Sequence, residues 1–98
     1  MRADFWNTRD DLNQSAVAFL LTDLTAAATL ADIALHTTDH QRRERAGSKA
    51  RNAYKTVLRL AGRYEFTSEQ MRAFRQKVEA LRSKLRRLGA NFATDQPA

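Results

Sequence analysis

The sequence predicts an all-α fold, an antiparallel three-helix bundle with helices over about residues 9–36, 40–62 and 68–88. Three observations support this prediction. The 98 residues contain only three glycines and one proline, so little interrupts a helix. Apolar residues recur with helical spacing in three successive stretches. The chain has the length of one domain, whose core is small. Residues 90–98 are expected to form a frayed tail.

The first helix is expected to begin between Thr8 and Asn13, because Thr8 and Asp11 have the spacing of a capping box. Its apolar residues cover a wide sector at 100° per residue, and such a sector needs two neighbouring helices. The members of this sector are Leu12, Ala16, Val17, Phe19, Leu20, Leu24, Ala27, Leu30, Ala31, Ala34 and Leu35.

A tight turn is predicted over residues 37–39, with Thr38 or Asp39 as the N-cap of the second helix. In the rival interpretation one helix continues to Ala46 and breaks at the following Gly-Ser pair. The turn at 37–39 is preferred because it gives helices of similar length. Gly62 is expected to end the second helix. One face of that helix is apolar and rich in alanine, with Ala46, Ala50, Ala53, Tyr54, Val57, Leu60 and Ala61.

The third helix opens with the clearest local signal, a capping box from Thr67 to Gln70. Phe66, just before it, is placed to pack on Met71 as a hydrophobic staple. Gly89 is expected to end the helix. Its apolar residues alternate in steps of three and four, which defines a heptad seam. The seam contains Met71, Phe74, Val78, Leu81, Leu85 and Leu88.

Composition narrows the compartment and the chemistry. The chain has no cysteine, which excludes disulfides, thiolate nucleophiles and Cys-ligated zinc. Its first residues contain charges and no apolar run, so no secretory signal is expected. Residues 16–35 are long enough to cross a membrane, but Asp23, Asp32 and the threonines favour a buried helix. A cytoplasmic protein without a membrane span is expected.

Possible catalytic or metal chemistry rests on few residues. Asp32, His36, His40 and Glu44 are spaced by four, and on one continuous helix they would form a column of metal ligands. The predicted turn at 37–39 breaks that column. Asp23 lies within the apolar sector, where pairing with an arginine or a threonine, or a hydrated edge, is favoured over catalysis. We therefore expect no enzyme, no cofactor and no metal.

The net charge is +6 and unevenly distributed. Residues 1–39 contain two arginines and six aspartates, whereas residues 40–63 contain eight Lys/Arg and a single glutamate. A basic face of this kind can bind phosphate backbones, which makes sequence-nonspecific nucleic-acid binding the alternative function. Neutralisation within the fold by the acidic first third, or between subunits, is the favoured interpretation. The candidate basic face comprises Arg45, Lys49, Lys55, Arg59, Arg63 and Arg86.

The leading functional prediction is a small non-enzymatic protein–protein interaction module that forms a homodimer or binds a partner helix. It rests on more apolar helix surface than three short helices readily bury. Packing within the chain is the competing use of the heptad seam. The candidate interface comprises Phe5, Trp6, Met71, Phe74, Val78, Leu81 and Leu85.

Residues 50–60, ARNAYKTVLRL, and the capped helix after them resemble the second and third helices of microtubule-interacting-and-trafficking domains and of tetratricopeptide hairpins. The resemblance implies a groove that binds a short amphipathic peptide. It rests on Ala/Tyr/Leu spacing. The Trp-Leu-Gly-Tyr and proline positions of the tetratricopeptide consensus are missing.

Overall fold

The computed structural model describes the backbone of residues 2–89 and the side chains of residues 11–89. Three helices account for nearly all of this part of the chain: α1 spans Arg2–His36, α2 spans His40–Ala61 and α3 spans Ser68–Arg87. The predicted all-α three-helix architecture is confirmed. The predicted tail at 90–98 lies outside the described residues.

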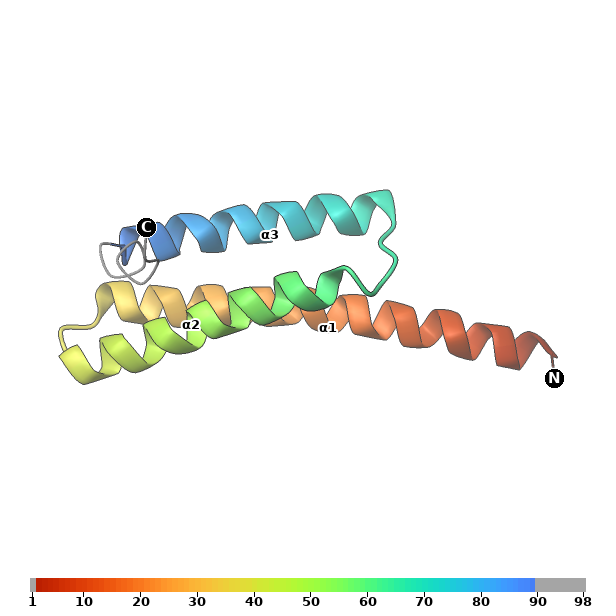
Figure 1. Ribbon diagram of the computed structural model, residues 1–98, viewed down its shortest axis with the longest axis horizontal. Helices are drawn as coiled ribbons and strands as arrows, with labels where there is room; N and C mark the ends of the chain where they lie inside the picture. Colours follow the sequence, from red (N-terminus) through yellow and green to blue (C-terminus); the bar gives the residue numbers. More distant parts are fainter. Residues whose placement is uncertain (1, 90–98) are drawn as a thin grey trace.

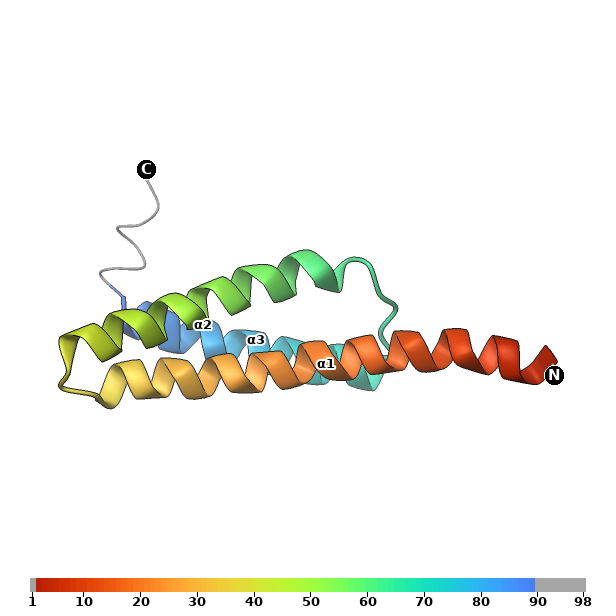
Figure 2. The same ribbon diagram turned by 90° about the horizontal axis from the view of Figure 1, so that it is seen from below.

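The longest helix, α1, lies at the centre of the arrangement. Both α2 and α3 pack mainly against α1 and contact each other far less. Its 35 residues correspond to a length of about 52 Å, against about 33 Å for α2 and 30 Å for α3. The N-terminal part of α1 therefore projects beyond the other two helices (Figures 1 and 2). The molecule is elongated, with extents of 56 × 27 × 21 Å.

The core is a continuous cluster built from one stripe of each helix. Alanines on α1 and α2 let these two backbones approach closely, and leucines and aromatic residues fill the space toward α3. From α1 come Val17, Leu20, Leu24, Ala27, Ala31 and Ala34; from α2 come Ala46, Ala50, Tyr54 and Val57; from α3 come Phe74, Val78, Leu81 and Leu85.

The start of α1 differs from the prediction. The helix begins at Arg2, not between Thr8 and Asn13. The predicted capping box at Thr8 is interior to the helix, because no glycine or proline precedes it to stop the backbone from continuing. The prediction of helices of similar length is wrong for the same reason.

The turn between α1 and α2 lies at residues 37–39, as predicted, and the rival continuous helix is wrong. The Asp39 carboxylate accepts hydrogen bonds from the backbone N–H groups of Gln41 and Arg42, at 3.0 and 3.3 Å. Arg43 reaches back and donates to the carbonyl oxygens of Ala34 and Thr37, both at 3.2 Å. The turn thus satisfies backbone groups at the ends of both helices.

The connection between α2 and α3 is fastened to α1. The Asn13 side chain donates from Nδ2 to the Glu65 carbonyl at 2.8 Å, and its Oδ1 accepts from the Glu65 N–H at 3.0 Å. The predicted capping box follows, with both reciprocal bonds between Thr67 and Gln70 formed. Phe66 packs edge-on against Phe74, with ring centroids 5.1 Å apart.

Candidate functional site

The predicted interface on α3 is not on the surface. Phe74, Val78, Leu81 and Leu85 are all buried within the chain, so this part of the heptad seam serves intramolecular packing. The wide apolar sector of α1 covers this part of the seam. Met71 is half-buried beside the same core. The other two candidates, Phe5 and Trp6, lie on the helical backbone of α1, but their side chains are outside those the structure describes.

A second heptad register lies on the outer side of α1. Leu12, Phe19, Ala26 and Ile33 recur every seven residues, which places them along one strip of the helix. The side chains of Leu12 and Phe19 are 67% and 62% exposed. Ala26 is exposed, and Ile33 is half-buried. We call these four residues the outer strip.

Sequence reasoning placed Leu12 and Phe19 in the apolar sector of the first helix without separating them from the core. The sector does contact two helices, as predicted, yet α2 and α3 cover only part of it. The seven-residue spacing of large apolar residues was the signal that could have identified the uncovered strip.

A hollow of about 280 Å³ lies between α1 and α2 at one end of the outer strip. Leu30 and Ile33 of α1 and Ala46 of α2 give it an apolar lining, and we call it the α1–α2 groove. Its remaining lining residues are the cations Arg42, Arg45 and Lys49 of α2. An apolar floor bordered by cations suits an amphipathic helix that carries acidic side chains.

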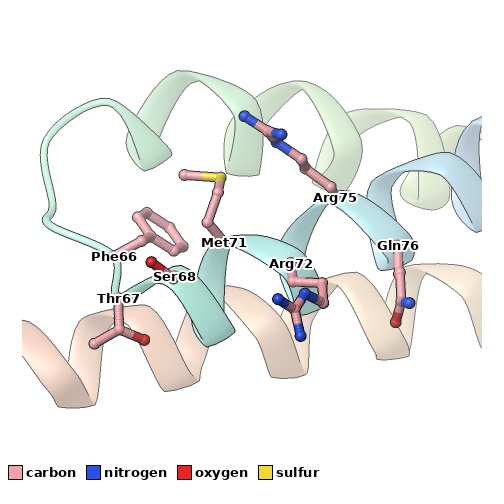
Figure 3. A pocket seen from close by; sticks show the side chains of 7 residues that line it. All are labelled: Phe66, Thr67, Ser68, Met71, Arg72, Arg75 and Gln76. Carbon is pink, nitrogen blue, oxygen red and sulfur yellow. The ribbon is translucent and has the colours of Figure 1, made fainter.

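A larger hollow of about 590 Å³ lies at the start of α3. Met71 and Arg75 rise from one side of α3, and Arg72 and Gln76 from another (Figure 3). No carboxylate or histidine lines this hollow, so its described lining offers no acid–base pair. The remaining lining residues are Phe66, Thr67 and Ser68.

The predicted basic face is exposed at every one of its positions. Arg45, Lys49, Lys55 and Arg59 lie on the outside of α2, and Arg63 follows that helix. Arg86 belongs to α3. Helix α3 contacts α2 at Tyr54. At 100° per residue, Tyr54 lies roughly 180° around α2 from Arg45. Arg86 is therefore not part of the same continuous surface.

The acidic residues at positions 11–39, whose side chains the structure describes, make no ion pair with this face. Within residues 11–89, the ion pairs are Arg82 with Glu79 and Lys84 with Asp32, and the His40 Nε2 lies 3.5 Å from Oε1 of Glu44. None of them involves Arg45, Lys49, Lys55 or Arg59. Among the aspartates at positions 11–39, the expected pairing with a lysine or arginine inside the fold is formed by Asp32, whose partner Lys84 lies on α3.

Arg82 has a structural role between α3 and α2. Its Nε donates to the Tyr54 hydroxyl oxygen at 3.0 Å. This hydrogen bond, followed by the charge of Glu79, raises the pKa of Arg82 above its ordinary value. Arginine is protonated at any physiological pH, so the shift leaves its charge unchanged.

The possible metal column is broken. The turn separates His36 from His40, and the His36 Nδ1 lies 2.8 Å from the Asp32 carbonyl oxygen within α1. His40 pairs instead with Glu44, at 3.5 Å. No group of three or more potential ligand side chains with metal-site geometry occurs among the residues searched, 11–89. Asp23 is half-buried and makes no ion pair with a described residue, which fits the hydrated-edge interpretation.

Residues Asp11–His36 of α1 are long and apolar enough, by length and composition, to cross a membrane. A core helix and a membrane span share these properties. In this structure six residues of the stretch are buried in the core that α1 forms with α2 and α3.

No protein-family model matches the sequence, and neither the curated proteins nor the solved structures contain a match to it.

Proposed function

We propose that this protein is a non-enzymatic interaction module that binds a helix on the outer strip of α1. The observation that carries the proposal is the exposure of Phe19, a large aromatic side chain in the middle of a helix whose other side is buried. Covering the exposed part of such a ring contributes roughly 1.5 to 2 kcal/mol. Leu12, one heptad away, adds a second anchor to the same strip.

The shape of α1 supports this proposal. The helix continues for about three turns before Asn13, the residue that fastens the α2–α3 connection. An isolated helical segment of that length is marginal in water, because most helical stability in proteins comes from packing of an apolar face. A partner helix that extended from the outer strip over this segment would provide that packing.

The α1–α2 groove extends the strip toward α2. Leu30 and Ile33 border the groove. One end of a helix bound along the strip would therefore lie near Arg42 and Lys49. The cations at this end favour acidic side chains on the bound helix. Charged residues that border a helix contact influence which partner and orientation it accepts.

Photo-cross-linking tests the proposal. A photoreactive phenylalanine analogue at position 19 is expected to give an adduct with a protein, whereas the same analogue at the exposed position Glu69 of α3 should give none. Replacing Leu12 by lysine should reduce the adduct from position 19. If position 19 gives no more adduct than position 69, the outer strip is not a binding surface.

The alternative function is sequence-nonspecific nucleic-acid binding by the basic face of α2. The observation in its favour is that Arg45, Lys49, Lys55 and Arg59 are exposed and form no ion pair among the described residues. Phosphate contacts release counterions, so affinity for duplex DNA would fall steeply between low and moderate salt. An electrophoretic shift assay at two salt concentrations checks this, and an absence of binding at low salt removes the alternative.

A further inference from the structure

We propose that the α1–α2 groove binds a single-chain anionic amphiphile, a short aliphatic chain that carries a phosphate head. The inference goes beyond the proposed function, because the ligand needs neither Leu12 nor Phe19. A helix on the outer strip would reach the groove with one end only. The two ligands would therefore share the cations of the groove and not the exposed aromatic ring.

Three cations border the α2 side of the groove. Arg42, Arg45 and Lys49 are spaced by three and four residues, which places them on one face of α2. All three side chains are exposed, and none forms an ion pair with a described residue. Oε1 of Glu44, the one acidic residue of α2, lies instead 3.5 Å from the His40 Nε2. The lining of the groove thus carries three positive charges and no carboxylate.

The floor of the groove is apolar. Leu30 and Ile33 of α1 and Ala46 of α2 form it. Leu30 and Ile33 are half-buried and Ala46 is buried, so the floor lies deeper than the exposed cations. The residues of α1 contribute no charge to the lining. A ligand that fits both halves has an aliphatic part against α1 and its negative charge toward α2.

The cations favour phosphate as the negatively charged head. A guanidinium group can donate two parallel hydrogen bonds to phosphate oxygens, and the lysine ammonium group is a further charged donor. A phosphate monoester carries a charge of about −1.5 to −2 at pH 7. Three cations match that charge more closely than the single charge of a carboxylate.

The depth of the floor favours a single amphiphile over a membrane or a nucleic acid. A surface that docks on a bilayer places its apolar side chains deeper in the lipid than its cations, whereas here the apolar side chains lie beneath the cations. A nucleic-acid backbone would contact the cations and leave the floor uncovered. The volume of about 280 Å³ is close to the lower limit of ligand sites, about 300 Å³, and suits one short chain.

Isothermal titration calorimetry with butyl, hexyl and octyl phosphate, each below its micelle-forming concentration, tests the proposal. Each added methylene group is expected to tighten binding by up to about fourfold, because the floor removes it from water. Inorganic phosphate lacks the chain and octanol lacks the charge, so each is expected to bind about tenfold or more weakly than octyl phosphate. An affinity that is the same for butyl and octyl phosphate overturns the proposal.

Two double variants locate the ligand. Arg45→Ala with Lys49→Ala removes two cations of the groove and is expected to weaken octyl phosphate binding about tenfold or more. Lys55→Ala with Arg59→Ala is the matched control, because it removes the same charge from exposed positions of α2 that do not line the groove. At about 0.15 M salt distant charges are largely screened, so the control should bind within about twofold of the original chain.

Equal losses in the two double variants would assign binding to the net charge of the protein and overturn the groove as the site. Circular dichroism of both variants checks that the helices are intact. Binding to vesicles of anionic phospholipid without binding to octyl phosphate would make a membrane the partner, which also overturns the proposal.

This proposal and the proposed function fail separately. If position 19 forms no adduct while octyl phosphate binds with the expected dependence on chain length, the outer strip is not a binding surface and the groove remains a ligand site. If position 19 forms its adduct and octyl phosphate does not bind, the groove site alone is removed.

Discussion

The Lys84 Nζ lies 2.7 Å from Oδ1 of Asp32, and this ion pair joins α3 to α1 across an interval of 52 residues. Lys77 donates to the Thr25 hydroxyl across the same interval, also at 2.7 Å. The constant interval shows that α1 and α3 run parallel and in register. The two lysines are one heptad apart and so are their partners, which makes the pairs successive rungs of one helix contact.

The ion pair of Lys84 with Asp32 should stabilise the bundle modestly, because both side chains are partly exposed, at 26% and 46%. A double-mutant cycle with Lys84→Ala and Asp32→Ala is expected to give a coupling energy of about 0.5 to 1 kcal/mol, decreasing with added salt. Urea unfolding measures it. Lys84→Met removes the charge but retains the apolar stem, so it should cost less than Lys84→Ala; an equal cost would assign the effect to the charge and not to packing of the stem.

Replacing Asn13 by alanine removes both hydrogen bonds to the Glu65 backbone. The expected loss is about 1 to 2 kcal/mol in the free energy of unfolding, since each bond contributes roughly 0.5 to 1.5 kcal/mol. Gln14→Ala is the matched control, an exposed neighbour on the same helix. Denaturant unfolding of the two variants compares them, and equal stabilities would mean that Asn13 does not hold the connection.

Gly47→Ala is expected to stabilise the protein by about 0.5 to 1 kcal/mol. Gly47 lies in the interior of α2, where glycine costs backbone entropy relative to alanine. A Cβ there would meet Leu88 Cδ1 at 3.8 Å and the Ala34 Cβ at 4.0 Å, which are ordinary contacts. Thermal unfolding measures the effect. A lower melting temperature would indicate that α1 and α2 approach more closely at this point than the structure shows.

The two heptad registers should respond differently to truncation. Leu81 is fully buried, so Leu81→Ala is expected to cost about 2 to 5 kcal/mol through lost burial and the cavity left behind. Phe19→Ala should leave the unfolding free energy of the monomer within about 1 kcal/mol, because most of that ring faces solvent. Denaturant unfolding of the two variants, at protein concentrations that keep the chain monomeric, compares their losses in unfolding free energy. Similar losses would contradict the assignment of the outer strip.

Local features of the fold could be predicted from the sequence because local geometry determines them. The capping box at Thr67 and the N-cap at Asp39 each depend on a few consecutive residues, and both are confirmed. The start of α1 was missed for a related reason. The cap signal at Thr8 competes with a backbone that nothing interrupts, and the sequence alone does not decide that competition.

Long-range features could not be predicted in the same way. The bonds between Asn13 and Glu65 join distant segments, and no pattern near either residue indicates them. The division of the apolar sector into a buried stripe and the outer strip depends on where two other helices lie. Periodicity shows only that the sector is wide. The basic face was predicted as exposed, but the lack of ion pairs between this face and residues 11–36 of α1 became apparent only from the structure.

Because α2 and α3 both pack mainly against α1, the order in which they dock on α1 can be inferred from those contacts. A three-residue turn joins α1 to α2, so the contacts near that turn are short-range in sequence. The α1–α2 hairpin therefore has a low entropic barrier to formation. The two rungs between α3 and α1 each span 52 residues and carry a larger loop-closure cost. With few contacts to α2, α3 is expected to dock last and to detach first, which would leave an α1–α2 hairpin as the most persistent unit of the chain.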